Sequence, residues 1–384
     1  MILLDGQRLY RHVQQFASAF GPRPAGGAAE TAARAALEQY LHQRGIYDTL
    51  RLPFSTANTW GYGTIVPLLG ALAAQLIPRA NRFVRAACSL FGAQQFWLTI
   101  SGRMREQPCY RLYPQFPGGT LVARIPAAET AARTVVLIGH TDTNKHRLTF
   151  SPALKRSLRL SSTSLLLSAL ANALASALGA RRLRLATAAY LAVGVASMLA
   201  DEAGGYVEGA NDNGSAMACV LGLGEQALAT PLATTDLWLV FSGSEEVSHD
   251  GLNVFLDGFG SQLQDAYFID FEMVGRGSIH YVERYGGLIY FTRYTPDAAS
   301  LRLATRAATR HAELQVTGRE VVLFDEVATL RRRGFRGITL VGVERDGFPA
   351  NWHQRTDRLA AIEPQALARA AQFAWRMIED LERQ

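Results

Sequence analysis

Short apolar segments alternate with longer amphipathic segments along most of the chain. Six short segments are β-branched and bounded by turn residues, as buried strands are: 120–126, 134–140, 237–243, 266–275, 278–284 and 337–343. Four longer segments repeat Ala and Leu at helical spacing: 26–44, 214–229, 301–313 and 364–384. This alternation predicts an α/β fold, a three-layer sandwich in which helices flank a mostly parallel mixed β-sheet.

Two strongly apolar regions, 61–101 and 159–200, interrupt this alternation. Each contains two apolar helical stretches around a bend that carries Arg, so each is predicted to be a helical hairpin inserted into a single domain, 1–384. Their stretches fall slightly short of the roughly 20 apolar residues that span a bilayer. Two interpretations stay open: hairpins that enter a membrane, or a soluble helical lid or oligomerisation bundle. Basic residues flank both hairpins on both sides, so the orientation stays open too.

The composition narrows the class of protein. Charged residues make up 19% of the chain and apolar residues 48%. This composition is strongly hydrophobic for a soluble enzyme but too polar for a polytopic transporter. The net charge of +6 comes mostly from Arg, without the interleaved aromatic residues of a nucleic-acid-binding face. We therefore expect no nucleic-acid partner. The mild positive charge beside apolar segments fits an anionic membrane surface better.

Cysteine usage and the first residues bear on the compartment. The three cysteines have no CxxC spacing, which argues against a disulfide scaffold and against a thiolate-ligated zinc site. The first 24 residues lack the continuous apolar core of a cleaved signal peptide. We expect a membrane-associated protein, or otherwise a cytoplasmic one, and leave open whether it is a homo-oligomer.

Five polar clusters follow the predicted strands, where ligands bind in sheets of this kind. They are His140 and Asp142, Asp212, Glu245 and Glu246, Asp270 and Glu272, and His353 and Asp357. Each cluster alone has an ordinary explanation, such as a turn or a helix start. Together, so many carboxylates would repel one another unless a bound divalent cation supplied the opposite charge.

The residue types indicate which metal. Two imidazoles with three carboxylates and no thiolate suit zinc, or failing that manganese or cobalt. Five ligands are too many for one tetrahedral ion but fit two ions that share a bridging carboxylate. In HTD, the spacing lets Asp142 accept the second ring N–H of His140. Of the adjacent Glu245 and Glu246, one can bind metal while the other takes a proton from the attacking water.

The ordered motifs GHTDT, GANDNGSA, SGSEEVSHDGL, FEMVG and NWHQRTD resemble metallopeptidase family 28, the co-catalytic di-zinc aminopeptidases. The resemblance covers residues 26–55, 119–148 and 205–384, but neither apolar hairpin. It implies a zinc-exopeptidase-like fold, two Zn²⁺ ions and a peptide substrate. It implies Glu245 as general base and Asp142 as a supporting carboxylate. The ligands that it implies are His140, Asp212 as the bridge, Glu246, Glu272 and His353.

The sequence departs from the family where Glu272 stands in place of the usual Asp. Asp270, two residues earlier on the same face of the strand, is a rival ligand. Asp325 lies in a segment that resembles one lining the family's substrate site, but it could instead cap a helix that begins near Glu326.

The expected function is that of a zinc-dependent exopeptidase. An aminopeptidase that removes N-terminal residues through a metal-bridging water, with Glu245 as general base, fits the motifs best. The alternatives are a glutaminyl-cyclase-like or carboxypeptidase activity on the same fold, or a non-catalytic peptidase-like receptor domain. The side-chain preference stays open.

Overall fold

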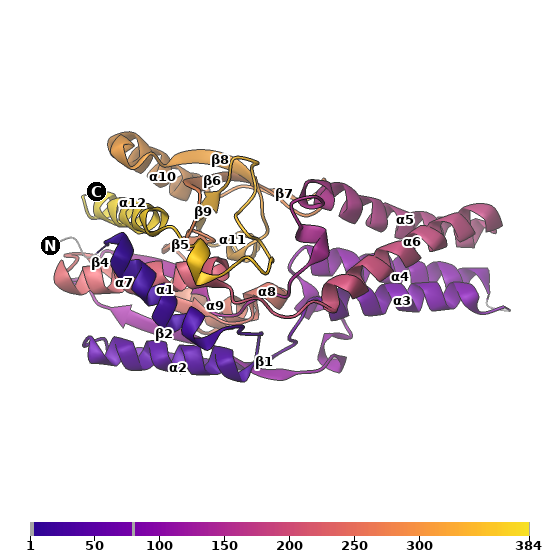
Figure 1. Ribbon diagram of the computed structural model, residues 1–384, viewed down its shortest axis with the longest axis horizontal. Coiled ribbons are helices and arrows are strands. Elements are labelled where there is room, and N and C mark those ends of the chain that lie inside the picture. Colours follow the sequence, from indigo (N-terminus) through magenta and orange to yellow (C-terminus); the bar gives the residue numbers. More distant parts are fainter. Residues whose placement is uncertain (1–3, 79–80, 384) are drawn as a thin grey trace.

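The computed structural model describes residues 4–78 and 81–383. Residues 79–80, at the bend of the first predicted hairpin, and the ends of the predicted 1–384 domain lie outside the described residues. Figure 1 shows a body built around a β-sheet, with both chain ends on it, and a bundle of helices that extends from the opposite side.

In the described residues, the helices are α1 Gly6–Phe16, α2 Ala28–Gln43, α3 Gly61–Leu76, α4 Arg82–Ile100, α5 Leu158–Leu178, α6 Arg181–Glu202, α7 Ser215–Ala229, α8 Glu245–Ser248, α9 Asp250–Phe259, α10 Ala298–Arg310, α11 Glu326–Arg332 and α12 Pro364–Glu382. The strands are β1 Thr49–Thr56, β2 Phe116–Ile125, β3 Arg133–His140, β4 Thr235–Ser242, β5 Tyr267–Glu272, β6 Ser278–Gly286, β7 Arg293–Tyr294, β8 Thr317–Val322 and β9 Ile338–Val343.

Within the described chain, the nine strands form one mixed sheet in the order β1-β2-β4-β3-β5-β9-β6-β7, with β8 paired to β6. The central strands β4, β3, β5 and β9 run parallel, and β1 and β2 add an antiparallel edge. On the other side, β6 is antiparallel to β9 and β7 but parallel to β8. The α/β prediction is confirmed, although the parallel pairing is concentrated in the centre of the sheet.

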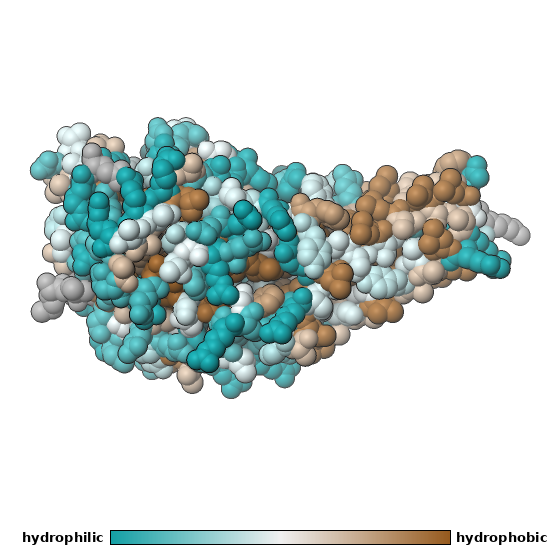
Figure 2. Space-filling view, turned by 90° about the horizontal axis from the view of Figure 1, so that it is seen from above, coloured by the Kyte–Doolittle hydropathy of each residue, from teal (hydrophilic) through white to brown (hydrophobic). Residues whose placement is uncertain are grey.

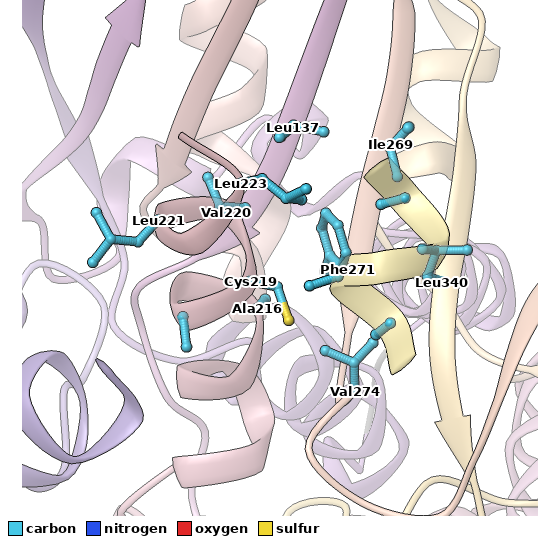
Figure 3. Packing of buried hydrophobic residues seen from close by; sticks show 14 of the residues in the cluster. Leu137, Ala216, Cys219, Val220, Leu221, Leu223, Ile269, Phe271, Val274 and Leu340 are labelled. Atoms are coloured by element: carbon cyan, nitrogen blue, oxygen red, sulfur yellow. The ribbon is translucent and has the colours of Figure 1, made fainter. Parts of the chain in front are cut away.

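Helices cover both faces of the sheet, as the three-layer prediction requires. On one face, α1, α2, α7, α10 and α12 share an apolar core with side chains of the central strands. Figure 3 shows Cys219 and Leu223 of α7 facing Leu137, Ile269 and Phe271 of the sheet. On the other face, α9 and α11 pack against the alternate strand residues, including Val136, Val240 and Phe268.

The two apolar regions form helical hairpins, α3–α4 and α5–α6, that pack together into the four-helix bundle (Figure 1). Its inner contacts include Leu68, Phe96, Leu165 and Leu191. Two helical stretches in the described residues, Lys155–Leu178 and Arg181–Glu202, are long and apolar enough to cross a membrane.

Candidate metal centre

The five predicted ligands converge at the carboxyl ends of the central parallel strands. His140 is the last residue of β3, and Glu272 is the last residue of β5. Glu246 lies in α8, directly after β4. Asp212 lies in η6, the short turn Ala210–Gly214 before α7, and His353 lies in the loop after β9. Parallel strands end at the same edge of a sheet, so residues distant in sequence meet there.

Asp212 lies between two groups of donor atoms. Its Oδ1 is 3.3 Å from Nε2 of His140, which is 3.7 Å from Oε1 of Glu272. Its Oδ2 is 3.4 Å from Nε2 of His353, which is 3.1 Å from Oε2 of Glu246. Within each group the ligand atoms lie within 4.8 Å of one another. The two oxygens of one carboxylate therefore face two separate three-residue sites.

Unsatisfied atoms show that these residues suit cations. In the described structure, Asp212 Oδ2, Glu246 Oε1 and His353 Nδ1 are buried without a hydrogen-bond partner. Burial, followed by the charges of Glu245, Asp270 and Asp212, raises the pKa of the Glu272 carboxyl well above its ordinary value, although His140 opposes this. Two divalent cations would supply partners for the Asp212 and Glu246 oxygens, and imidazole and carboxylate donors without thiolate suit zinc. The roles of the five residues as ligands stay predictions.

The turn that carries Asp212 is held from two sides. The Asp357 carboxylate accepts hydrogen bonds from the main-chain N–H groups of Asn211, at 2.6 Å, and Asp212, at 3.0 Å. The Asn211 side chain bonds to Ala350 and Gly275, and the Asn213 side chain bonds to Phe271 and Met273. The Asp212–Asn213 peptide bond is cis. The GANDNGSA segment is thus tied to the end of β5 and to the loop that carries His353.

Asp142 has a different main contact from the one that its spacing predicts. Its carboxylate accepts the main-chain N–H groups of Glu245, at 3.0 Å, and Glu246, at 3.1 Å. Nδ1 of His140 lies 3.1 Å from the main-chain oxygen of Asp142 and 3.5 Å from its carboxylate. Asp142 therefore supports the paired glutamates through its side chain, and the closer contact to His140 is through its backbone.

Glu245, the predicted general base, lies at the start of α8 and is 8% exposed. Its Oε2 lies 3.7 Å from Nε2 of His140, and its Oε1 lies 3.2 Å from Nε2 of His249. Burial raises the pKa of the Glu245 carboxyl well above its ordinary value, and the charges of Glu246, Asp142 and Asp212 raise it further, against the effect of His140. A carboxylate with a raised pKa is a stronger base.

Asn144 reaches into the second donor group and is a residue that the sequence reasoning missed. Its Nδ2 donates to Oε2 of Glu246 at 2.7 Å and lies 3.3 Å from Nε2 of His353. Its Oδ1 accepts from Nε of Arg147 at 2.9 Å, which leaves the amide N–H₂ group directed at the site. Arg147 in turn donates to Glu202, the last residue of α6, at 2.8 Å. The final turn of the bundle thus contacts the metal centre through two side chains.

Glu272 and Asp270, the two candidates for one ligand position, lie in different surroundings. Only Glu272 belongs to a donor group in the described residues, because Asp270 lies deeper along β5, beside Thr339. Asp325 caps α11 through the N–H of Val327 and accepts a 2.6 Å bond from Thr339. The capping interpretation of Asp325 is the one that the structure shows.

A pocket of about 90 Å³ adjoins the metal centre. Its lining is mainly apolar and includes Phe150, Met273, Leu323, Phe324 and Trp352 beside Asp212, Glu245 and Glu272. Thr99 and Ile100, at the end of α4, also line it, so the bundle forms part of the wall.

Comparisons with known proteins agree with this geometry. The model of peptidase family M28 matches residues 120–378. The fold is similar to those of a zinc aminopeptidase from Bacillus subtilis (11% identity, TM-score 0.60, covering 99% of this chain and 96% of that one) and a Zn-dependent exopeptidase from Parabacteroides distasonis (13%, 0.56, 97% and 96%). It is also similar to that of a glutaminyl cyclase from an Acidobacteriales bacterium (15%, 0.57, 99% and 95%). Comparison with curated proteins finds no significant match.

The matched segment contains all five strand-end clusters and extends over most of the chain. The chain therefore belongs to peptidase family M28, and it is a metallopeptidase of the zinc-exopeptidase fold.

Proposed function

We propose that the protein is an aminopeptidase that holds two zinc ions, bridged by Asp212. The observation that carries this proposal is the position of the Asp212 carboxylate, whose two oxygens lie 3.3 Å and 3.4 Å from His140 and His353. In this assignment, Glu272 completes one site and Glu246 the other. A pair of ions in such a site polarises the scissile carbonyl and makes a water more acidic.

The protein's own groups would move the proton. Glu245 accepts the proton of the attacking water and then gives it to the departing amine, which its raised pKa favours. The Asn144 amide N–H, held by Arg147, can donate to the oxygen on which negative charge develops. The narrow pocket beside these groups suits the end of a peptide better than its middle.

The test compares Glu245→Gln with Glu246→Gln in the full chain. Glu245→Gln should keep the metal content of the parent protein and lower kcat by about 10²- to 10⁴-fold, because it removes only the proton acceptor. Glu246→Gln should lower the metal content. Activity that survives Glu245→Gln would contradict the proton-transfer role.

A substrate panel separates the candidate reactions. Aminoacyl, carboxy-terminal and N-terminal glutaminyl peptides would be assayed with and without a chelator. We expect chelator-sensitive hydrolysis of the aminoacyl substrates, and cyclisation of the glutaminyl peptide alone would favour the cyclase alternative.

We also propose that the α3–α6 bundle lies in a lipid bilayer. Large apolar side chains point outward along it, including Leu174, 60% exposed, and Val193, 65% exposed. Figure 2 shows hydrophobic residues gathered along the bundle, in contrast to the mostly hydrophilic body. Besides its apolar contacts, the interior of the bundle contains a polar network in which Gln75 donates to Ser89 and Ser89 donates to Asn172. Helices in lipid are arranged in this way: their outer faces are apolar, and polar side chains form hydrogen bonds between the helices.

The charges on the bundle are confined to its two ends. Residues 160–178 of α5 and 185–200 of α6 contain no Asp, Glu, Lys or Arg. At 1.5 Å per residue, the shorter stretch is about 24 Å long, close to the roughly 30 Å hydrocarbon thickness of a bilayer. Arg181, Arg182 and Arg184 lie at the far tip, and Asp201 and Glu202 lie next to the body. In this arrangement, the tip reaches the opposite headgroup layer. A full-length chain that stays soluble without detergent would contradict membrane insertion.

A further inference from the structure

A second cavity lies at the base of the bundle, directly beside the metal-site pocket. It measures about 250 Å³, against about 90 Å³ for the pocket at the metal centre. Four side chains line both: Trp60, Ile100, Phe150 and Leu288. The Arg147 guanidinium stacks on the Trp60 ring, with its carbon 3.9 Å from the ring centre. One row of apolar side chains is therefore the boundary between the two spaces.

The lining of this base cavity suits an uncharged, aliphatic ligand. Its walls come from α4, α5 and α6, with Phe96, Leu158, Leu165 and Met198 among the apolar side chains. Within the described chain, Asp201 is the one charged residue that lines the cavity. Thr149 donates two hydrogen bonds, of 3.1 Å and 2.6 Å, to the Asp201 carboxylate. The small side chains of Ser161 and Ser197 leave room rather than filling it.

The base cavity reaches the outer surface of the bundle between α5 and α6. Tyr190 and Val193 line it and are 43% and 65% exposed. These residues lie in the apolar section between the charged ends of α6. The outer surface of the bundle and the base cavity are thus joined by apolar side chains, and only the shared row of Trp60, Ile100, Phe150 and Leu288 lies between this cavity and the metal-site pocket.

We propose that the base cavity binds the aliphatic chain of an amphiphilic amide, whose amide group then lies at the metal centre. The inference rests on the proposed peptidase function and adds to it a class of substrate: an N-terminal aminoacyl amide that carries a long alkyl chain and comes from the bilayer. An apolar cavity of about 150 Å³ already holds a benzene ring. The larger base cavity accommodates an alkyl chain in the same way.

The chain could lie on either side of the scissile bond, and two substrate series distinguish these arrangements. The first is leucyl amides of n-alkylamines from C2 to C12, in which the chain leaves with the amine. The second is p-nitroanilides of 2-aminoalkanoic acids of increasing length, in which the chain stays on the acyl side. Both are assayed with zinc-loaded, detergent-solubilised full-length protein.

We expect kcat/KM to rise about two- to fourfold per added CH₂ in one series, until the cavity is full, and then to level off. A flat dependence in both series, with the short substrates hydrolysed, would overturn this inference and leave the proposed function intact. If no substrate is hydrolysed by metal-loaded protein, the proposed function fails instead.

Filling the base cavity is the matched test. Ser197→Phe and Ser161→Phe add a ring to its wall, whereas Ala196→Phe adds the same ring to an exposed neighbour on α6 that does not line it. The filled variants should lose the gain with chain length but hydrolyse the C2 amide like the parent protein, and Ala196→Phe should behave like the parent protein throughout.

A binding measurement does not depend on turnover. In Glu245→Gln, a substrate of the series that shows the gain with chain length, brominated on its alkyl chain, should quench the fluorescence of Trp60, and the quenching should be weaker in Ser197→Phe. Equal quenching in the two proteins, measured against a Trp60→Phe reference, would also overturn the assignment of the cavity.

Discussion

Nε2 of His249 lies 3.2 Å from Oε1 of Glu245, and Nδ1 of the same ring lies 3.0 Å from the Thr329 hydroxyl. Burial, together with the charge of Arg332, lowers the pKa of His249 to about 3, so the ring is neutral at physiological pH. A neutral ring that donates from Nε2 and accepts at Nδ1 from Thr329 fixes Glu245 in one orientation without neutralising its charge.

Replacing His249 should therefore weaken catalysis without removing the metal. We expect His249→Ala to lower kcat about 10- to 100-fold, the usual size for a group that orients a functional side chain, with little change in KM or metal content. His42→Ala, on α2, is the control histidine substitution. Steady-state kinetics combined with metal analysis checks this prediction, and a loss of bound metal in His249→Ala would show that the ring supports the ligands instead.

Asp212→Asn should lower the amount of bound metal more than it lowers the stability of the metal-free protein. An amide offers one oxygen where the carboxylate offers two, so the two donor groups can no longer share a bridging anion. We expect the metal content to fall from about two ions per chain to one or fewer. Asp236→Asn is the control, because Asp236 bonds the main chain of Ala127, in the turn between β2 and β3. A full metal complement in Asp212→Asn would refute the bridging assignment.

The metal-free protein should lose stability as the pH rises from 6.5 to 8. Burial raises the pKa of Glu326 to about 8 and that of Asp357 to about 7, so the folded protein binds protons that the unfolded chain has already lost in this range. Stability from such groups is complete below their ordinary pKa and is lost as the pH passes the folded value. His249, whose folded pKa is lowered, has the opposite effect, but only below about pH 6.5.

We expect a decrease of about 2–4 kcal/mol in the free energy of unfolding over this range, measured by denaturant titration in the presence of a chelator. Glu326→Gln removes one of the titrating groups and should flatten the profile. A free energy that increases from pH 6.5 to 8 would contradict the prediction.

Lysine substitutions on the outer face of α5 separate the two interpretations of the bundle. Leu167 and Leu174 are 48% and 60% exposed and do not line the base cavity. In water, Leu167→Lys with Leu174→Lys should be nearly neutral, whereas in a bilayer each Lys near the centre costs about 2.5–3.5 kcal/mol. We expect the double variant to leave the membrane fraction, and Leu228→Lys on α7 of the body to remain with it. If the parent protein, the double variant and Leu228→Lys all stay in the soluble fraction, the result would favour a soluble lid.

The central strands could be predicted from the sequence because they are buried on both faces and therefore read as continuous apolar runs. β1 could not, since only Thr56 of its eight residues is buried, and Pro53 lies inside it. α1 was also missed, because its buried positions include the polar side chain of His12. Elements at the edges of a sheet carry weaker patterns, and their pairing is set by the strands beside them.

A similar difference in the strength of the sequence pattern separates the predicted ligands from the residues that support them. His140, Asp212 and His353 could be predicted because five polar clusters that all follow strands are hard to explain together without a bound cation. Asn144 could not, because its function depends on Glu246, 102 positions away in the sequence. His249 lies outside the five polar clusters, although its spacing of four from Glu245 is a signal that the sequence contains.

The ion pairs of Glu202 with Lys145 and Arg147 restrict how the length of the bundle can change. One residue inserted or deleted near the end of α6 would turn Glu202 by about 100° around the helix axis and remove it from the loop that holds Asn144. Residues added at the bends between α3 and α4 or between α5 and α6 would lengthen the helices without changing this register. Under the proposal that the bundle lies in a bilayer, related chains in membranes of different thickness should therefore differ in length at the tip and keep the final turn of α6 in place.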